Sequence, residues 1–277
     1  MDNMERYFKS LFTNSMNILV VATFSYFCIR ILQAHIAEVC VDFADYLLML
    51  LSGLLLSTIS LLIAYFWRGD KKLLSLTIFF FLFYVGGLSG QIDALIFTTI
   101  PRSIILLEVI VVFAISLLFS LIFSKLYMGK TDDVVKFRIG AGLIVKFVAL
   151  AFVYVILYLL MGGIFYDLLT KPFYASMELP LIPGESIDIV SMLIPLQIFR
   201  GLLFVLSALP LILYCRGIRG ISLGVFTGLA LWMVGGLCPL LIPNPYMPAV
   251  LRFYHIIEIF FQDFPLGFVI YCFLNIT

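Results

Sequence analysis

Two short segments carry ionisable side chains inside otherwise apolar stretches. "RFYHIIE" (252–258) places an arginine, a histidine and a glutamate within two helical turns, and "RSIILLE" (102–108) has the same arginine and glutamate spacing. On a helix, positions 255 and 258 are neighbours, whereas positions 252 and 258 are separated by about 240°. The spacing predicts a contact between His255 and Glu258. A histidine beside a carboxylate can serve as a general acid and base.

The chain around these segments is apolar. Of its 277 residues, 64% are hydrophobic and 12% are charged, compared with about 25% charged residues in soluble domains. A membrane-spanning helix needs about 20 apolar residues. Eight runs meet this requirement, at about 14–36, 46–66, 73–98, 103–125, 140–165, 190–214, 221–243 and 249–275. The sequence predicts an all-α integral membrane protein.

Charge differs between alternate connections. With a cytoplasmic N-terminus, each inner segment is basic: Arg6, Lys9, Arg68, Lys71, Lys72, Lys125, Lys130, Lys136, Arg138, Arg216 and Arg219. Short loops rich in lysine and arginine stay in the cytoplasm. We therefore expect both termini to be cytoplasmic.

Several motifs occur twice along the chain at nearly constant offset. "GLLLSTISLLIAYFWRG" (53–69) matches "GLLFVLSALPLILYCRG" (201–217) at a glycine, two leucines and the final Arg-Gly, and "VGGL" occurs at 85–88 and at 234–237. "RSIILLE" aligns in the same way with "RFYHIIE".

These matches predict two tandem four-helix repeats, 1–139 and 140–277. Each repeat has an even number of helices, so both have the same orientation and are related by an approximate two-fold axis along the membrane normal. In transporters with parallel repeats, the binding site lies near the repeat interface.

With this topology, most polar residues of the spans fall in the outer half of the membrane. An ion at the centre of a helix costs about 2.5–3.5 kcal/mol, so these groups must lie near the interface, face one another or line a wet cavity. We expect an outward-facing polar pocket. Its candidates are Arg102, Glu108, Gln197, Arg200, Arg252, His255 and Glu258, and Arg30, Gln91 and Asp93 lie in the same half.

The repeat also predicts partners for the charged residues. Arg102 of one half would pair with Glu258 of the other, and Arg252 with Glu108. Polar residues that only hold a helix bundle together are the alternative.

Two of the candidates have no counterpart in the first half. Ile105 occupies the position equivalent to His255, and Ser52 the position equivalent to Arg200. Because His255 and Arg200 are not repeated in the first half, they are better functional candidates than the residues that occur in both halves.

No catalytic, metal or cofactor motif accompanies these residues. The histidines and cysteines lack zinc or haem spacing, and no dinucleotide or Walker A motif is present. No serine or cysteine nucleophile beside a base can be named. Cys40 and Cys238 both fall near the outer surface, so a disulfide between them is one alternative and free thiols are the other.

Three segments carry a resemblance. "LIPLQIFRGLLFVLSALPLI" (193–212), "LLIPNPYMPAVLRFYHIIE" (240–258) and "VYVILYLLMGG" (153–163) resemble a family of bacterial multi-pass inner-membrane proteins with no assigned activity. That family shares Gln-x2-Arg-Gly-Leu-Leu, Asn-Pro-x-Met-Pro and Arg-x2-His-x2-Glu segments. The matching residues are Gln197, Arg200, Gly201, Asn244, Pro245, Met247, Pro248, Arg252, His255 and Glu258. The resemblance implies a location in the bacterial cytoplasmic membrane.

Three functions fit these observations. The first is a permease or ion-coupled carrier of a small polar solute. The second is a non-catalytic membrane component or sensor of an envelope or export system, with a membrane protein as its partner. The third is an intramembrane enzyme acting at the outer leaflet. Nothing indicates nucleic acid binding. A carrier needs a polar route inward, for which only Asp263 and Pro265 in the apolar inner half are candidates.

Overall fold

The computed structural model describes residues 2–97, 100–125, 141–176, 186–244 and 247–274, and within these ranges it contains helices and no strand. Eight helical runs are long and apolar enough to cross a membrane. They are Thr13–Ile36, Phe43–Phe66, Lys71–Ala94, Arg102–Lys125, Gly142–Phe173, Leu193–Tyr214, Ile221–Leu241 and Ala249–Leu274. The prediction of a multi-pass, all-α membrane protein is confirmed.

The first half contains four spans. They are α1 (Asp2–Ile36), α2 (Phe43–Phe66), a third span made of α3 (Lys71–Phe80), the π-helical segment η1 (Phe81–Leu88) and α4 (Ser89–Phe97), and α5 (Arg102–Lys125). The predicted inner connection with Lys130, Lys136 and Arg138 lies outside the described residues.

The second half also contains four spans. Its spans are α6 (Ala141–Phe165) with η2 (Tyr166–Thr170) and α7 (Lys171–Ser176), then α8 (Ser186–Tyr214), then a seventh span of α9 (Ile221–Trp232), η3 (Met233–Leu237) and α10 (Cys238–Leu241), and finally α11 (Ala249–Leu274). Both halves therefore interrupt their third helix with a π-helical segment.

Aspartates define the starts of two helices. The side chain of Asp42 accepts from the backbone N–H of Asp45, and the side chain of Asp45 accepts from that of Asp42, which is a capping box at the start of α2. Asp70 accepts from the N–H groups of Lys72 and Leu73 at the start of α3. These caps satisfy N–H groups that have no partner within the helix.

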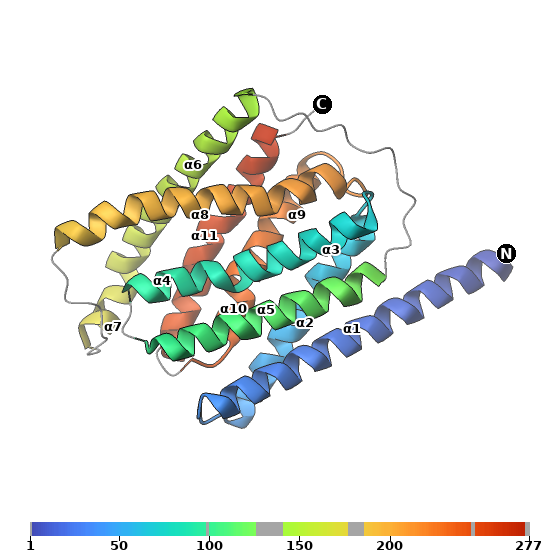
Figure 1. The fold of residues 1–277 in the computed structure, drawn as a ribbon, viewed down its shortest axis with the longest axis horizontal. Helices are drawn as coiled ribbons and strands as arrows, with labels where there is room; N and C mark the ends of the chain where they lie inside the picture. Colours follow the sequence, from blue (N-terminus) through green and yellow to red (C-terminus); the bar gives the residue numbers. More distant parts are fainter. Residues whose placement is uncertain (1, 98–99, 126–140, 177–185, 245–246, 275–277) are drawn as a thin grey trace.

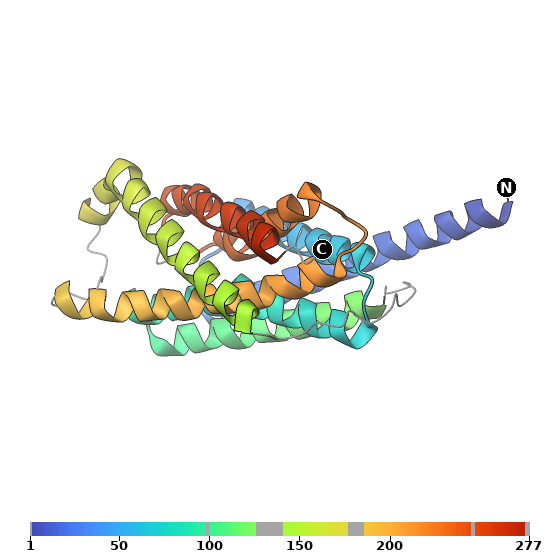
Figure 2. The ribbon, with the colours of Figure 1, turned by 90° about the horizontal axis from the view of Figure 1, so that it is seen from above.

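The spans form two layers, which Figure 2 shows edge-on. In one layer the third span lies between α8 and α5, and in the other the seventh span lies between α2 and α11. The remaining helices bridge the layers at opposite ends: α1 contacts α2 and α5, and α6 contacts α8 and α11 (Figure 1). The helix pairs of the first half thus recur in the second.

The two layers cross at the paired VGGL segments. A Cβ added to Gly86 would lie 3.1 Å from Cγ1 of Val234, and one added to Gly235 would lie 3.2 Å from Cγ1 of Val85. Glycine at both positions lets the helices approach closely, and a methyl group at either one would push against the facing valine. η1 and η3 therefore contact each other reciprocally at the centre of the molecule.

The outer surface of the bundle is apolar. Large side chains such as Val20, Phe24, Val145 and Phe253 are more than half exposed, which suits contact with hydrocarbon rather than water. The packed interior is also apolar, with Tyr26, Phe119, Leu150 and Phe204 among its buried side chains. Buried polar groups stand out against this background.

Candidate functional site

Two clusters of buried and partly buried polar side chains lie between the helices of the bundle. The first cluster consists of Tyr26, Arg30, Gln33, Ser52 and Glu108. The second cluster consists of Tyr84, Asp93, Tyr154, Tyr158, Gln197 and Arg200. Each cluster centres on one buried arginine.

In the first cluster, Arg30 is 4% exposed. Its Nη1 donates to Oε1 of Glu108 at 2.7 Å and to Oε1 of Gln33 at 2.6 Å. Nε2 of Gln33 also donates to Glu108. The carboxylate and guanidinium are thereby held between α1 and α5.

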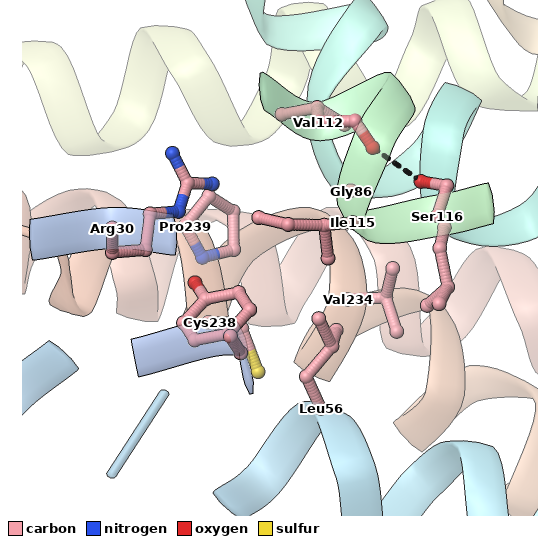
Figure 3. A pocket seen from close by; sticks show the side chains of 11 residues that line it. Arg30, Leu56, Gly86, Val112, Ile115, Ser116, Val234, Cys238 and Pro239 are labelled. Carbon is pink, nitrogen blue, oxygen red and sulfur yellow. Dashed lines mark hydrogen bonds between the residues drawn. The ribbon is translucent and has the colours of Figure 1, made fainter. Parts of the chain in front are cut away.

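The Tyr26 side chain extends this cluster to the second half. Its ring lies 5.4 Å below the Arg30 guanidinium, and its hydroxyl is 2.8 Å from that of Ser52. Ser52 Oγ donates to the main-chain oxygen of Cys238 at 2.8 Å. A cavity of about 20 Å³, lined in part by Arg30, Cys238 and Pro239, lies here (Figure 3). It has room for about one water molecule.

In the second cluster, Arg200 is 6% exposed. Its Nη1 lies 2.7 Å from both carboxylate oxygens of Asp93 and donates to Oε1 of Gln197 at 3.0 Å. The Tyr84 hydroxyl donates to the main-chain oxygen of Arg200 at 3.2 Å. Because α8 belongs to the second half and α4 to the first, this ion pair joins the two halves.

Two tyrosines form the aromatic wall of the second cluster. The Arg200 guanidinium lies 5.8 Å from the ring of Tyr154 and 5.7 Å from the ring of Tyr158. Cation–π contacts of this kind stabilise a guanidinium away from water.

The two clusters have the same frame. Gly53 packs against Tyr26 and the main-chain oxygen of Thr23, and Gly201 packs against Tyr154 and the main-chain oxygen of Ala151. In the first cluster, the guanidinium of Arg30 and the ring of Tyr26 come from the same helix, α1. In the second cluster, the guanidinium comes from Arg200 of α8, whereas the rings of Tyr154 and Tyr158 come from α6.

The predicted contact between His255 and Glu258 is confirmed. His255 Nδ1 lies 2.7 Å from Oε2 of Glu258, and Nε2 of Gln262 donates to Oε1 of Glu258 at 3.0 Å. The side chains of His255 and Glu258 are 20% and 12% exposed. Glu258 is within electrostatic range of Asp93 and Tyr158, so this pair borders the second cluster.

The predicted exchange of charged partners between the halves is wrong. Glu108 pairs with Arg30 instead of Arg252, because α1 lies against α5. Glu258 pairs with His255 of its own helix instead of Arg102, which is exposed. Of the predicted residues, Glu108 lies in the first cluster and Gln197 and Arg200 lie in the second. His255 and Glu258 border the second cluster, and Arg102 and Arg252 belong to neither.

Arg252 has a structural position. It is 8% exposed, and its Nη1 donates to the main-chain oxygens of Leu241 and Ile242 at the end of α10. A cation at the C-terminal end of a helix satisfies carbonyl groups that lack a partner there.

Some buried donors have no hydrogen-bond partner among the described residues. They include Nε of Arg30 in the first cluster, Nε of Arg200 and Nε2 of Gln197 in the second cluster, and Nε of Arg252. An unsatisfied buried polar group costs about 1–3 kcal/mol. The second cluster holds two such donors, one turn apart on α8.

The sequence alone did not single out Arg30 and Asp93 as partners, although both were placed in the same half of the membrane as the candidates. The four tyrosines of the two clusters were not singled out, because an aromatic residue in an apolar helix is ordinary. Tyr26 and Tyr154 each end a Phe-x-Tyr segment, at 24–26 and 152–154, and each packs against the glycine of its own half, Gly53 or Gly201.

The cysteines and possible metal ligands add no further site. All five cysteines are free, with Cys40 exposed and Cys238 buried, so they form no disulfide with each other. Within the described part of the chain, no group of three or more histidine, cysteine, aspartate or glutamate side chains could hold a metal ion.

No protein-family model, curated protein or solved structure matches the chain. The resemblance to a family of bacterial inner-membrane proteins stays a prediction. The fold and the site together define a multi-pass helical membrane protein with two buried polar clusters.

Proposed function

We propose that this protein is a membrane permease or ion-coupled carrier of a small polar solute, and that the second cluster binds the solute. The cluster lies between the two halves of the chain, where Arg200 of α8 meets Asp93 of α4. Sites at this position are typical of carriers built from repeats.

The observation that carries the proposal is the pair of unsatisfied donors. Nε of Arg200 and Nε2 of Gln197 are buried and have no partner in the described chain. Both are donors only, so a ligand that completes them must offer acceptor oxygens. A carboxylate or hydroxyl group fits this requirement, and the rings of Tyr154 and Tyr158 provide an apolar wall for the rest of the solute.

We infer that the two halves are tandem repeats in parallel orientation. The reciprocal packing of Gly86 on Val234 and of Gly235 on Val85 supports this, as does the recurrence of the same helix pairs in both halves. The halves contact each other where η1 meets η3, where α8 packs on η1 and where α2 packs on α10. Movement of one repeat against the other is how many carriers alternate access.

We also infer that the protein lies in a bacterial cytoplasmic membrane with both termini inside. The basic inner connections support this orientation. It places His255, Glu258 and the second cluster toward the outer surface, where a solute would enter.

A non-catalytic membrane component is the second candidate. It is favoured by the first cluster, in which Arg30, Gln33 and Glu108 bond one another. The nearby cavity of about 20 Å³ holds no more than water. On this view both clusters only hold the bundle together.

Binding distinguishes the two candidates. Purified protein in detergent would be heated with a panel of single solutes: short-chain carboxylates, amino acids, polyols and sugars. A ligand that binds only the folded state raises the free energy of unfolding by RT ln(1 + [L]/Kd), and the midpoint of thermal unfolding rises with it. We expect one chemical class to stabilise the wild type and not Arg200→Lys, which keeps the charge but lacks Nε. Equal stabilisation of both proteins, or of neither, would contradict the proposal.

A further inference from the structure

Asp263 is a buried carboxyl group that the solute site does not use. It is 3% exposed and lies near the middle of α11, where water is most distant. Ion pairs within 4.0 Å in the described parts of the chain join other residues, and Asp263 belongs to none of them. A carboxylate in this position needs compensation, because burying an unpaired charge is costly.

Arg200 is the cation in electrostatic range of Asp263. Its Nη1 already lies 2.7 Å from Asp93. One guanidinium therefore faces two carboxyl groups, and a single positive charge cannot balance both. The second carboxyl group must gain a positive charge from elsewhere.

The position of Asp263 is at the crossing of the two halves. A Cβ on Gly235 would lie 2.9 Å from Oδ2 of Asp263 and 3.5 Å from the main-chain oxygen of Val85. Oδ2 of Asp263 in the second half and the main-chain oxygen of Val85 in the first half, which accepts from Ser89 Oγ, thus both lie beside Gly235. Gly235 and Val85 belong to η3 and η1, and π-helical segments occur frequently at functional sites.

The surrounding groups favour a proton over a metal ion. Besides Arg200 on α8, Tyr154 on α6 and Tyr84 on η1 interact electrostatically with Asp263. Of the other elements that contact α11, α9 and η3 contain no ionisable residue, whereas α10 contains Cys238 and η2 contains Tyr166 and Asp167. On α11 itself, Glu258 is engaged by His255 and Gln262. A metal cation would be repelled by Arg200, whereas a proton neutralises the carboxylate without adding an unbalanced charge.

We propose that Asp263 is the proton-binding group that couples the movement of the two halves to the membrane proton gradient. A proton from water adds to a carboxylate oxygen and forms an O–H bond, and the same bond breaks when the proton returns to water on the other side. No other reactant takes part. The coupling role depends on the proposed carrier function, whereas proton binding by Asp263 can be measured without a solute.

Infrared difference spectroscopy on the full-length protein in liposomes tests proton binding. We expect a carboxylic acid C=O band at neutral pH that disappears when the pH is raised. The band should be absent in Asp263→Asn, shifted in frequency in Asp263→Glu, and retained in Asp93→Asn. An identical band in wild type and Asp263→Asn would overturn the proposal.

Two further outcomes have separate meanings. Replacing an organic cation with sodium should leave the band unchanged, and loss of the band with sodium would assign the site to a metal ion and overturn the proton assignment. If the band behaves as expected but no solute stabilises the protein, proton binding stands and the carrier function fails. If a solute binds but the band does not depend on Asp263, the carrier function stands and this proposal fails.

Discussion

Gly235 lies directly against Asp263: a Cβ at position 235 would be 2.9 Å from Oδ2 of the carboxyl group. The equivalent glycine of the first half, Gly86, meets only Val234. The two positions have similar apolar contacts, and a carboxyl group is present at one of them only. Substitutions at the two glycines therefore distinguish an effect on helix packing from an effect on the Asp263 carboxyl group.

The first prediction compares alanine at these two glycines. Gly235→Ala should displace the Asp263 carboxyl group and shift or abolish its infrared band, because Oδ2 would lie closer to the new methyl group than real contacts allow. Gly86→Ala should leave the band unchanged, because Val234 alone must yield there. Overpacking costs about 1–3 kcal/mol at such positions, so the two variants should lose similar amounts of stability. Equal effects on the band would contradict the account.

The second prediction concerns the first cluster. Arg30→Met leaves the Glu108 carboxylate without its cation, and breaking a buried ion pair costs about 3–5 kcal/mol. Because the Glu108 side chain is 21% exposed, we expect a value near the lower end. Unfolding in detergent measures the loss.

The matched control is the double variant Arg30→Met with Glu108→Gln. Removing both charges should recover most of the lost stability, and solute binding should match that of the wild type. A double variant that loses solute binding would place the first cluster in the solute site and contradict its structural role.

The third prediction separates the two glutamines that contact a buried arginine. Gln197→Leu removes a donor with no partner, so solute affinity should fall about 10- to 100-fold, the effect of losing a hydrogen bond to a ligand. Gln33→Leu removes a glutamine whose amide already donates to Glu108, so it should lower stability and leave affinity unchanged. Isothermal calorimetry with the stabilising solute measures both variants. The reverse pattern would place the site in the first half.

The fourth prediction concerns the closest helix contact. A Cβ on Gly228 of α9 would lie 2.4 Å from the main-chain oxygen of Phe264 in α11. Backbone cannot yield as a flexible side chain does, so Gly228→Ala should destabilise the fold by about 1–3 kcal/mol. Gly163→Ala, where no atom lies within 4 Å, is the control and should be neutral. Equal stability of the two variants by thermal unfolding would show that α9 and α11 separate easily.

The fifth prediction tests the orientation. Cys40 is exposed between α1 and α2, so a membrane-impermeant maleimide should label it in intact cells. Cys215, just beyond α8, should stay unlabelled even after lysis, because burial raises the pKa of its thiol and suppresses the thiolate that reacts. Cys40→Ser should abolish labelling in intact cells. Labelling of Cys40 only after lysis would invert the topology.

The spans were predictable from the sequence because membrane thickness sets a minimum apolar length for each helix. The contact between His255 and Glu258 was predictable for a similar reason, since helix geometry alone brings those positions together. Neither prediction required knowledge of how helices pack against one another.

The partners of the arginines depend on that packing and could not be read from the sequence. We expected residues at matching positions of the two halves to have matching partners. This expectation paired Arg102 with Glu258 and Arg252 with Glu108. The structure places the guanidinium groups by the contact of α1 with α2 and of α6 with α8. Arg30 and Arg200 lie on helices that do not correspond between the two halves. An alignment of the halves therefore cannot show that both guanidinium groups lie over a tyrosine ring.

Solute transport tests the central claim most directly. The wild-type protein and Arg200→Lys would be reconstituted in proteoliposomes, and uptake of the stabilising solute would be followed with a proton gradient imposed across the membrane. We predict concentrative uptake by the wild type and loss of uptake in Arg200→Lys, with both proteins folded and inserted to the same extent. Absence of uptake by the wild type, or equal uptake by the two proteins, would contradict the assignment of the second cluster as the site of a carrier.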